Sequence, residues 1–359
     1  MKKKILFLGD GIYTKNLLKL YSATLFDKYL IDYKLLNSQN KKFKKKFKIN
    51  LIDKKKILSL TKKFKINFVI TNQNDFAIPT YGYLCTKLGL SGIPYAVCNR
   101  FANKKKCREY LKNIRSCKKF IPHFYFNSNK IPKSQRNKKL IIKPINMQGS
   151  RYVEKISFYQ LKQKIKNLNK VNIKYIIEEY IKGQDYAVES VIINKKIHNL
   201  VISKKIKFPN SFIDRKIISK NFIENKIENK IYKINKLILK NLKLENGLTH
   251  LEFRSDYKGN IFLIEAACRG AGSGISNIIV PYLTGFDTDE FLFEMSLGKK
   301  FTWKDCHTKK RKTILIWLNK NEKFLLKNKN NLLFYKKKRI LSKIVNSEDR
   351  GSFFIKKVL

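Results

Sequence analysis

Acidic residues are scarce in this chain: 26 Asp and Glu stand against 79 Lys and Arg, so its 359 residues carry a formal net charge of +53. Arginine is scarce as well, with 11 copies against 68 lysines. A nucleic-acid-binding protein usually concentrates its basic residues on one face and uses Arg for bidentate contacts. Here lysine runs such as 54–56, 104–106 and 336–338 are scattered along the chain. We therefore interpret them as solvated surface lysines that attract anions weakly, and we expect no specific nucleic-acid partner.

Long apolar runs are also missing. No stretch approaches the roughly 18–20 apolar residues that a membrane-spanning helix needs. After the basic start only Ile5–Leu8 is apolar, which is too short for the core of a signal peptide. The 6 cysteines form no CxxC pair, and Cys306–His307 is an isolated neighbour pair. We therefore expect a cytoplasmic protein with reduced thiols, no zinc site of this kind and no membrane partner.

Hydrophobic residues make up 43% of the chain, too much for a disordered tail, and the length suggests about two or three domains. Near the N-terminus, the apolar run 5–8 is followed by Gly9-Asp10-Gly11 and a helical pattern. A second strand (67–70) and helix (79–88) follow. Strands that alternate with helices predict an open parallel α/β layer over residues 1–100. Thr14 stands where a dinucleotide motif has its third glycine, so the motif is a weak indication of a dinucleotide site.

The middle of the chain has a different pattern. Strands are predicted at 139–143, 175–181 and 186–193, with a helix at 158–168, which indicates a small α+β domain over about 118–202. A long helix is predicted from 227 to 242, ended by Asn246-Gly247. Another should begin at Asp287, with Glu290 as its capping-box partner, and end at Gly298. The polar segment 203–225 is predicted to be a mobile loop.

The segment 250–265 is the most informative, because two alternating runs flank a Gly-containing turn, which predicts a β-hairpin. A turn centred on Lys258-Gly259 places Glu252 opposite Glu265. The other face would then hold the apolar side chains Leu251, Phe253, Phe262 and Ile264. Two carboxylates about 5 Å apart repel by roughly 3 kcal/mol at an effective dielectric of about 20. Mg²⁺ would offset this repulsion; the alternative is that each glutamate points separately into water beside lysines.

Two further segments have residues suited to anions. Residues 266–274 are small residues around Arg269, which would let the backbone and the guanidinium approach an anion; the alternative is a flexible connector. Lys143 ends a predicted strand and precedes the turn 146–151, a pattern that can cradle phosphates. The edge of the strand 175–181 could hold a flat heteroaromatic ring through backbone groups.

In this order and spacing, the motifs resemble the ATP-grasp superfamily, specifically its carboxylate–amine ligase type, which is also similar to biotin carboxylase and carbamoyl phosphate synthetase. The resemblance runs from about Lys4 to Gly298, and Asp349-Arg350-Gly351 with 353–355 is similar to the closing strand of that group. It implies an α/β and α+β fold with an N-terminal Rossmann-like pre-ATP-grasp domain (1–100). A small lid subdomain with a leading helix (101–202), a large subdomain with the metal site (203–300) and C-terminal strands that complete it (301–359) would follow.

The resemblance also implies roles for individual residues. Lys104 and Lys143 match the nucleotide-binding lysines, Gly149 and Ser150 belong to the phosphate-covering loop, and Arg269 matches the catalytic arginine that steadies the transferred phosphate. The remaining matches are Glu178, Glu179 and Ile181 at the adenine hinge, Asp185 at the ribose, and Glu252 and Glu265 as metal ligands. ATP and Mg²⁺, with Mn²⁺ as an alternative, are the implied cofactors. Ala267 departs from the pattern, because many relatives have an asparagine metal ligand there.

The activity that this resemblance implies is an ATP-dependent ligase that joins a small-molecule carboxylate to an amine through an acyl phosphate. Two alternatives stay open: a related ATP-grasp reaction with bicarbonate or a purine-pathway acid as the acceptor, and a non-catalytic polyanion-binding protein. The segment 208–220 and the Arg269 loop should line the substrate pocket, but they do not name the acid. His250 shares the face of Glu252, and it would contact substrate or be a structural histidine. Relatives often form dimers, so a homodimer is the assembly to test.

Overall fold

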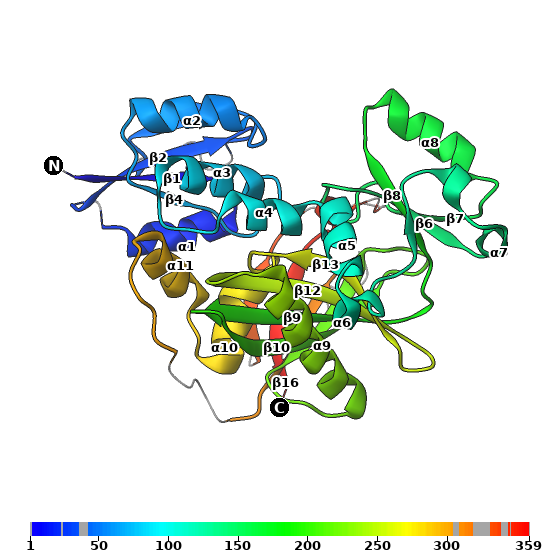
Figure 1. Ribbon diagram of the computed structural model, residues 1–359. Helices are drawn as coiled ribbons and strands as arrows, with labels where there is room; N and C mark the ends of the chain where they lie inside the picture. Colours follow the sequence, from blue (N-terminus) through cyan, green and yellow to red (C-terminus); the bar gives the residue numbers. More distant parts are fainter. Residues whose placement is uncertain are drawn as a thin grey trace.

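The computed structural model describes residues 2–22, 24–35, 42–303, 309–318, 331–338, 344 and 346–358. These residues form three β-sheets with helices around them (Figure 1). The Cys306–His307 pair lies outside the described residues. The five cysteines inside them are buried and free, as expected for reduced thiols.

The N-terminal sheet is parallel, as predicted, with the strand order β3-β2-β1-β4. Its strands are β1 (Lys3–Leu8), β2 (Phe26–Asp32), β3 (Lys45–Lys48) and β4 (Phe68–Ile70). Helices α1 (Ile12–Leu20), α2 (Lys54–Lys63) and α3 (Ile78–Leu88) connect and cover them. α3 ends at Gly89, whose φ of +63° is easy for a residue without a Cβ. Side chains Ile5–Leu8 of β1 are almost completely buried, which explains the apolar run in the sequence.

A second, smaller sheet stands away from the rest of the molecule (Figure 1, green). Its order is β5-β8-β6-β7 and its pairs are antiparallel. Its elements are β5 (Phe124–Tyr125), η1 (Ser128–Lys130), α7 (Lys133–Arg136), β6 (Leu140–Pro144), β7 (Glu154–Ile156), α8 (Leu161–Lys170) and β8 (Tyr175–Glu179). A separate apolar core that includes Leu140, Ile142 and Leu168 holds α8 on this sheet. We call this unit the lid sheet. Helices α4 (Tyr95–Ala102), α5 (Lys104–Lys112) and α6 (Arg115–Lys118) lead into it.

The third sheet has eight strands in the order β13-β12-β9-β10-β11-β14-β16-β15, with antiparallel pairs throughout. The strands are β9 (Gly183–Ile193), β10 (Lys196–Lys207), β11 (Asp214–Lys220), β12 (Gly247–Asp256), β13 (Ile261–Ala267), β14 (Lys312–Trp317), β15 (Leu332–Lys336) and β16 (Phe353–Val358). The remaining elements of this part of the chain are α9 (Lys226–Leu242), η2 (Ile275–Ile279), α10 (Val280–Thr284), α11 (Thr288–Ser296), which lies beside α1, and η4 (Ser347–Asp349). The C-terminal strands therefore complete this sheet.

Strand pairing corrects two expectations for the middle of the chain. Segment 203–225 is not an irregular loop, because it contains the end of β10 and all of β11. β9 and β10 pair with β12 and β11 in the large sheet, so the lid sheet ends at Glu179, well before residue 202.

The ends of two predicted helices can also be compared. Helix α9 ends at Leu242, where Lys243 adopts a φ of +57°, and Gly247 begins β12 instead of ending the helix. α11 follows the predicted Asp287 cap, whose side chain accepts from the Glu290 N–H at 3.0 Å.

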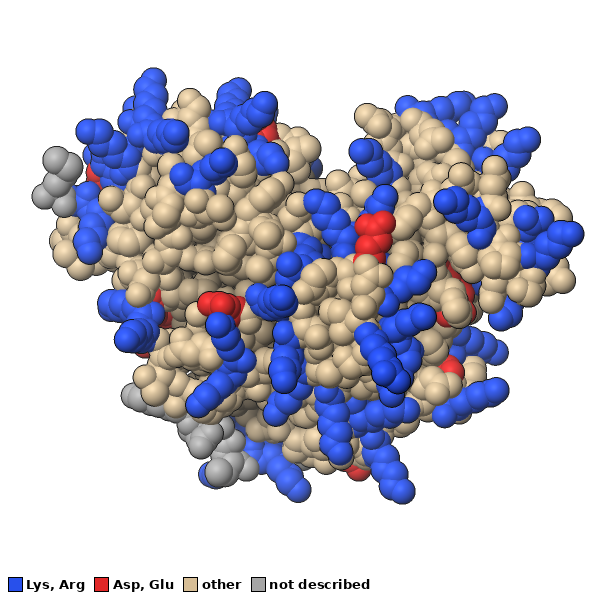
Figure 2. Space-filling model, viewed as in Figure 1, with Lys and Arg blue, Asp and Glu red and all other residues tan. Residues whose placement is uncertain are grey.

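Lysine and arginine side chains are spread over the whole face shown in Figure 2, over the N-terminal sheet, the lid sheet and the large sheet alike. This distribution fits a solvated lysine surface on that face. No helix among the described residues combines the length and the apolarity needed to cross a membrane.

Candidate functional site

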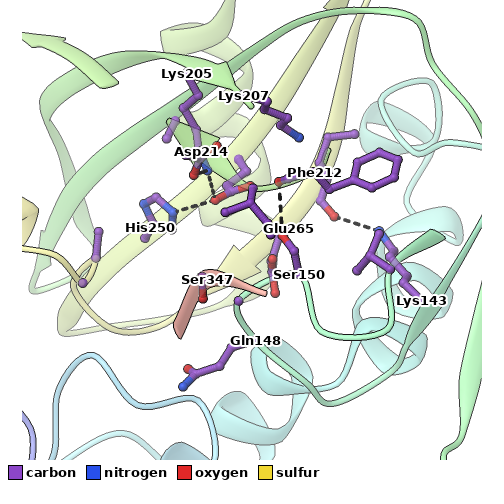
Figure 3. A pocket seen from close by; sticks show the side chains of 18 of the residues that line it. Lys143, Gln148, Ser150, Lys205, Lys207, Phe212, Asp214, His250, Glu265 and Ser347 are labelled. Atoms are coloured by element: carbon purple, nitrogen blue, oxygen red, sulfur yellow. Dashed lines mark hydrogen bonds and ion pairs between the residues drawn. The ribbon is translucent and has the colours of Figure 1, made fainter. Parts of the chain in front are cut away.

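A cavity of about 300 Å³ lies between the lid sheet, the large sheet and the loops of the N-terminal domain. Most of the residues that the sequence singled out line it: Lys104, Lys143, Gly149, Ser150, Glu178, Glu179, Ile181, Glu252, Glu265 and Arg269. Asp185 does not. Part of the wall is drawn in Figure 3, where the labelled side chains from β10, β12 and β13 point toward the loop that carries Gln148 and Ser150.

The two glutamates lie directly opposite each other on β12 and β13, as the hairpin argument predicted. Directly paired residues of an antiparallel ladder share one face, so both carboxylates point into the cavity. Their side chains are 24% and 29% exposed, enough for a ligand to reach them. Glu265 Oε1 lies 2.8 Å from Lys104 Nζ. Glu252 Oε1 contacts Lys205 Nζ and lies 3.1 Å from His250 Nε2.

The hairpin differs from the prediction on the side toward its turn. Phe253 pairs with Leu263, whereas Glu252 pairs with Glu265, so Ile264 is an extra residue in a β-bulge. The buried face therefore holds Leu251, Phe253, Ile261 and Leu263, while Ile264 and Phe262 are only half-buried. The prediction that Phe262 and Ile264 join the apolar face was wrong, because alternation is interrupted at a bulge.

This bulge contributes directly to the site. The carbonyl oxygen of Ile264 accepts hydrogen bonds from Arg108 Nη2 at 2.8 Å and from Lys143 Nζ at 3.2 Å. Bulges free backbone groups from the ladder and often occur next to functional sites. Here the freed carbonyl fixes two cations beside Glu265.

Lys143 and Glu178 form a buried ion pair at 2.7 Å, and Arg108 Nε lies 2.8 Å from the other oxygen of Glu178. Burial is the largest influence on the pKa of Lys143 and lowers it to about 8, although Glu178 opposes that shift. Burial would raise the pKa of Glu178, but Arg108 and Lys143 hold it below its ordinary value. Glu178 is therefore an ionised carboxylate that holds Lys143 in place.

The loop after β6 covers the cavity and is fixed from three sides. Lys104 Nζ donates to Met147 O at 2.8 Å, Ser347 N donates to Gly149 O at 3.0 Å, and Ser150 Oγ donates to Phe212 O at 3.2 Å. The φ of Gly149 is +70°, and a Cβ there would lie 2.1 Å from Ser347 Oγ. Only glycine fits this closed arrangement without a shift. We call residues 147–151 the covering loop.

The expected adenine hinge lies at the end of β8. Glu179 N donates to His123 O at 3.0 Å, and the Ile181 carbonyl accepts from Arg254 Nη1 at 3.0 Å. Asp185, expected at the ribose, instead binds Arg254 through both carboxylate oxygens and Lys207 at 2.5 Å. Asp185 is not among the residues that line the cavity, and its role at the ribose stays a prediction. It fixes Arg254, which in turn holds the Ile181 carbonyl.

Arg269 is held by a partner that sequence reasoning missed. Its Nε and Nη2 each lie 2.7 Å from one oxygen of Asp75, a residue of the loop after β4. Burial would lower the pKa of Arg269, but Asp75 raises it above its ordinary value, so the guanidinium stays charged. Asp75 N also donates to Gln148 Oε1 at 3.0 Å. One residue of the N-terminal domain therefore fixes both parts of the site: the Asp75 carboxylate holds the arginine, and its backbone N–H holds the covering loop.

Two further side chains surround Glu252: Lys205, from a strand that carried no motif, and His250, which the sequence placed on the same face. Lys205 on β10 lies 2.9 Å from Asp214 and also contacts Glu252. His250 Nδ1 contacts Glu189, and although burial would lower the pKa of His250, Glu189 and Glu252 raise it to about 9. No signal in the sequence indicated Lys205, because one lysine among 68 is not distinctive.

The donor set fits Mg²⁺ that shares its coordination with phosphates. Two carboxylates share a face inside the cavity, and lysine side chains offset their mutual repulsion. A bound cation would offset the same repulsion. No group of three or more His, Cys, Asp or Glu in the described part of the chain is arranged to hold a metal alone. Mg²⁺ usually takes one or two carboxylates and completes its shell with water and substrate phosphates.

Comparison with known proteins agrees with this geometry. Residues 136–277 match the family model of the ATP-grasp domain. The structure is similar to an L-amino acid ligase from Bacillus licheniformis, with 18% identity, a TM-score of 0.78 and coverage of 99% of this chain and 93% of that one. No curated protein matches the chain by sequence.

Two other similar structures contain a nucleotide. N5-carboxyaminoimidazole synthetase from Staphylococcus aureus, complexed with ADP, is 14% identical, with a TM-score of 0.72 and coverage of 100% and 94%. The biotin carboxylase domain dimer of a Hydrogenobacter thermophilus 2-oxoglutarate carboxylase, in complex with MgADP, ADP and bicarbonate, is 15% identical, with a TM-score of 0.69 and coverage of 100% and 86%. At these identities the likeness concerns the fold.

Proposed function

We propose, from the match of residues 136–277 to the ATP-grasp domain and from the fold shared with ATP-grasp structures, that this chain is an ATP-dependent ligase that joins a carboxylate to an amine through an acyl phosphate. The observation that carries the proposal is the pair Glu252 and Glu265, which face each other inside a cavity with Lys104 and Lys143 beside them. Phosphoryl transfer needs positioning and charge neutralisation more than it needs a protein nucleophile.

In this proposal Glu252 and Glu265 would hold Mg²⁺, which when bound would neutralise the negative charge of the phosphates. Lys104 and Lys143 bind the phosphates of ATP, with Glu178 and the Ile264 carbonyl fixing Lys143. Gly149 and Ser150 of the covering loop keep water from the phosphates. Glu179 and Ile181 offer backbone groups to the adenine at the end of β8.

The reaction has two steps. A carboxylate oxygen of the first substrate attacks the γ-phosphorus, the bond to the bridging oxygen breaks, and ADP leaves. The amine nitrogen of the second substrate then attacks the acyl carbon, phosphate leaves with the electron pair of the broken C–O bond, and the nitrogen loses its proton. Arg269 stabilises the negative charge that both steps place on the transferred phosphoryl group, and Asp75 positions it.

A phosphate-release screen tests this function. Purified protein with MgATP would be offered L-amino acids in pairs, other carboxylates with amines, and bicarbonate, with mass spectrometry on each product. We expect phosphate only when Mg²⁺, an acid and an amine are all present, and an amide as product. Release with bicarbonate alone would favour a carboxylase-type reaction. Steeply salt-dependent polyanion binding that Glu265→Ala leaves unchanged, without turnover, would favour a non-catalytic binding protein.

A further inference from the structure

Arg350 is unlike the other cations that line the cavity. Each of the others has a carboxylate partner: Lys104 with Glu265, Lys143 with Glu178, Arg151 with Glu348, Lys205 with Asp214 and Glu252, Lys207 and Arg254 with Asp185, and Arg269 with Asp75. Arg350 forms no ion pair with any described residue. Arg350 is half-buried in the cavity wall, and a partly desolvated charge without a counter-ion can be matched by an anion from outside the chain.

The surroundings hold the Arg350 guanidinium in a fixed orientation. Its Cζ lies 3.8 Å from the centroid of the Trp317 ring, in a cation–π contact. Nε donates to Ser347 O at 2.9 Å, and Nη2 lies 3.5 Å from Ser273 Oγ. Nη1 has no partner among the described residues, which leaves donors for a ligand. Burial lowers the pKa of Arg350 to about 10, as expected for a guanidinium whose charge is not matched.

The place of Arg350 indicates which anion it would bind. The charges of Asp214 and Glu252 raise its pKa only in part, and both carboxylates are already paired with Lys205. The lysines proposed for the ATP phosphates lie around Glu265 and the Ile264 carbonyl, whereas Arg350 lies at the Glu252 side. Trp317 and Ser273 are in contact with Arg350; the same cavity is also lined by Ile275 and Gly272, and Gly272 has open space where a Cβ would stand.

We propose that Arg350 binds the carboxylate of the amine-bearing substrate, so that this substrate is an amino acid and not a simple amine. The proposal rests on the ligase function and extends it to the class of the second substrate. A planar guanidinium matches both oxygens of a carboxylate.

The reacting carboxylate is a poorer candidate for Arg350. A bidentate contact would occupy the oxygen that must attack phosphorus, and it would have to break as the acyl phosphate forms. A carboxylate that takes no part in the chemistry keeps its charge through both steps, so the same contact orients the amine throughout.

The test compares amino acids with their amides. Wild-type protein loaded with MgADP is titrated calorimetrically with L-amino acids and with the corresponding carboxamides, which keep the amine and lose the carboxylate charge. We expect amino acids to bind at least about tenfold more tightly, as is usual for a charged hydrogen-bonded contact, and we expect Arg350→Gln to remove that preference. Arg350→Lys should keep part of it. Arg115→Gln, at an exposed arginine of α6, is the matched control.

Each other outcome overturns the proposal. If the wild-type protein bound amino acids and their carboxamides equally well, no residue would be recognising the carboxylate. An unchanged preference in Arg350→Gln would assign the carboxylate to another residue. Weaker MgATP binding in Arg350→Gln with unchanged amino-acid binding would assign Arg350 to the nucleotide. Because binding is measured without turnover, absence of ligation in the phosphate screen would refute the proposed function separately.

Discussion

Glu252 and Glu265 are the residues on which turnover should depend most strongly. Replacing either with Gln keeps the shape and removes one negative charge, so the lysines beside it would remain while Mg²⁺ would lose a ligand. We expect ATP turnover to fall by about two orders of magnitude or more, with partial recovery at high Mg²⁺ for one of the variants. Steady-state phosphate release at several Mg²⁺ concentrations measures this.

A matched control is Glu245→Gln, because Glu245 forms an exposed ion pair with Lys195 away from the cavity. Its turnover should match wild type. Full activity in Glu252→Gln would contradict the metal assignment.

Lys143 should make nucleotide affinity depend on pH. Its pKa of about 8 means that the ammonium group predominates below that pH and is lost as pH rises through it. Phosphates favour the charged form, so MgATP affinity should decline above about pH 8, by at most about tenfold per pH unit. Lys143→Met should bind MgATP about 10–100-fold more weakly at pH 7 and should lack this decline. Titrations with a fluorescent nucleotide between about pH 6.5 and 9.5 would measure this decline. If the affinity of the wild-type protein did not change with pH, Lys143 would not be the phosphate ligand that titrates.

At the scale of elements, the covering loop is closed by a glycine that faces Ser347. In Gly149→Ala the new Cβ would lie 2.1 Å from Ser347 Oγ. The loop must then shift, and we expect faster hydrogen exchange in residues 147–151 and turnover that is about tenfold lower. Because Ser347→Gly removes the clashing atom, the double variant should regain most of the lost activity. A double variant no better than Gly149→Ala would mean that backbone strain alone causes the defect.

The hairpin shows how far the sequence predicted the site and where it did not. The loop contains three residues, since Asp256 N donates to Asn260 O at 3.0 Å, so it is one residue longer than the predicted turn. The bulge at Ile264 adds one residue to β13 and restores the pairing of Glu252 with Glu265. Alternation and a turn glycine predicted the facing glutamates, but a bulge leaves no local pattern, so the freed carbonyl was not foreseen.

Other missed features depend on contacts between distant segments. Asp75 and Arg269 are paired across 194 positions, and neither neighbourhood indicates the other. Strands β2 and β3 and the pairing of β9 with β12 were likewise set by tertiary packing. Short periodic elements with a cap, such as α3 and α11, were predicted well, because the chemistry that ends or begins them is local.

For the molecule as a whole, Asp289 should make stability fall as pH rises. Burial is the largest cause that raises the pKa of Asp289 to about 7, and the negative charge of Asp287 is the second. The pKa of an aspartate in the unfolded chain is near 4. The folded state therefore binds this proton more tightly than the unfolded state, and stability is lost between about pH 4 and 7 and stays lower above that. Oδ1 of Asp289 has no hydrogen-bond partner among the described residues.

Asp289→Asn removes the charge and should raise the free energy of unfolding by about 1–3 kcal/mol at pH 8 and by little at pH 5. Urea denaturation at the two pH values measures the difference. Equal effects at both would mean that Asp289 titrates normally in the folded protein.

The large sheet takes its strands from separated parts of the chain, and this has a consequence for synthesis on the ribosome. The hairpin with both glutamates emerges well before β14 and the segment that carries Arg350. A nascent chain that has reached β13 holds the proposed metal ligands and the lysines around them, but it lacks Trp317 and Arg350, which also line the cavity. During translation, the residues proposed to bind the nucleotide should therefore be complete earlier than those proposed to bind the second substrate.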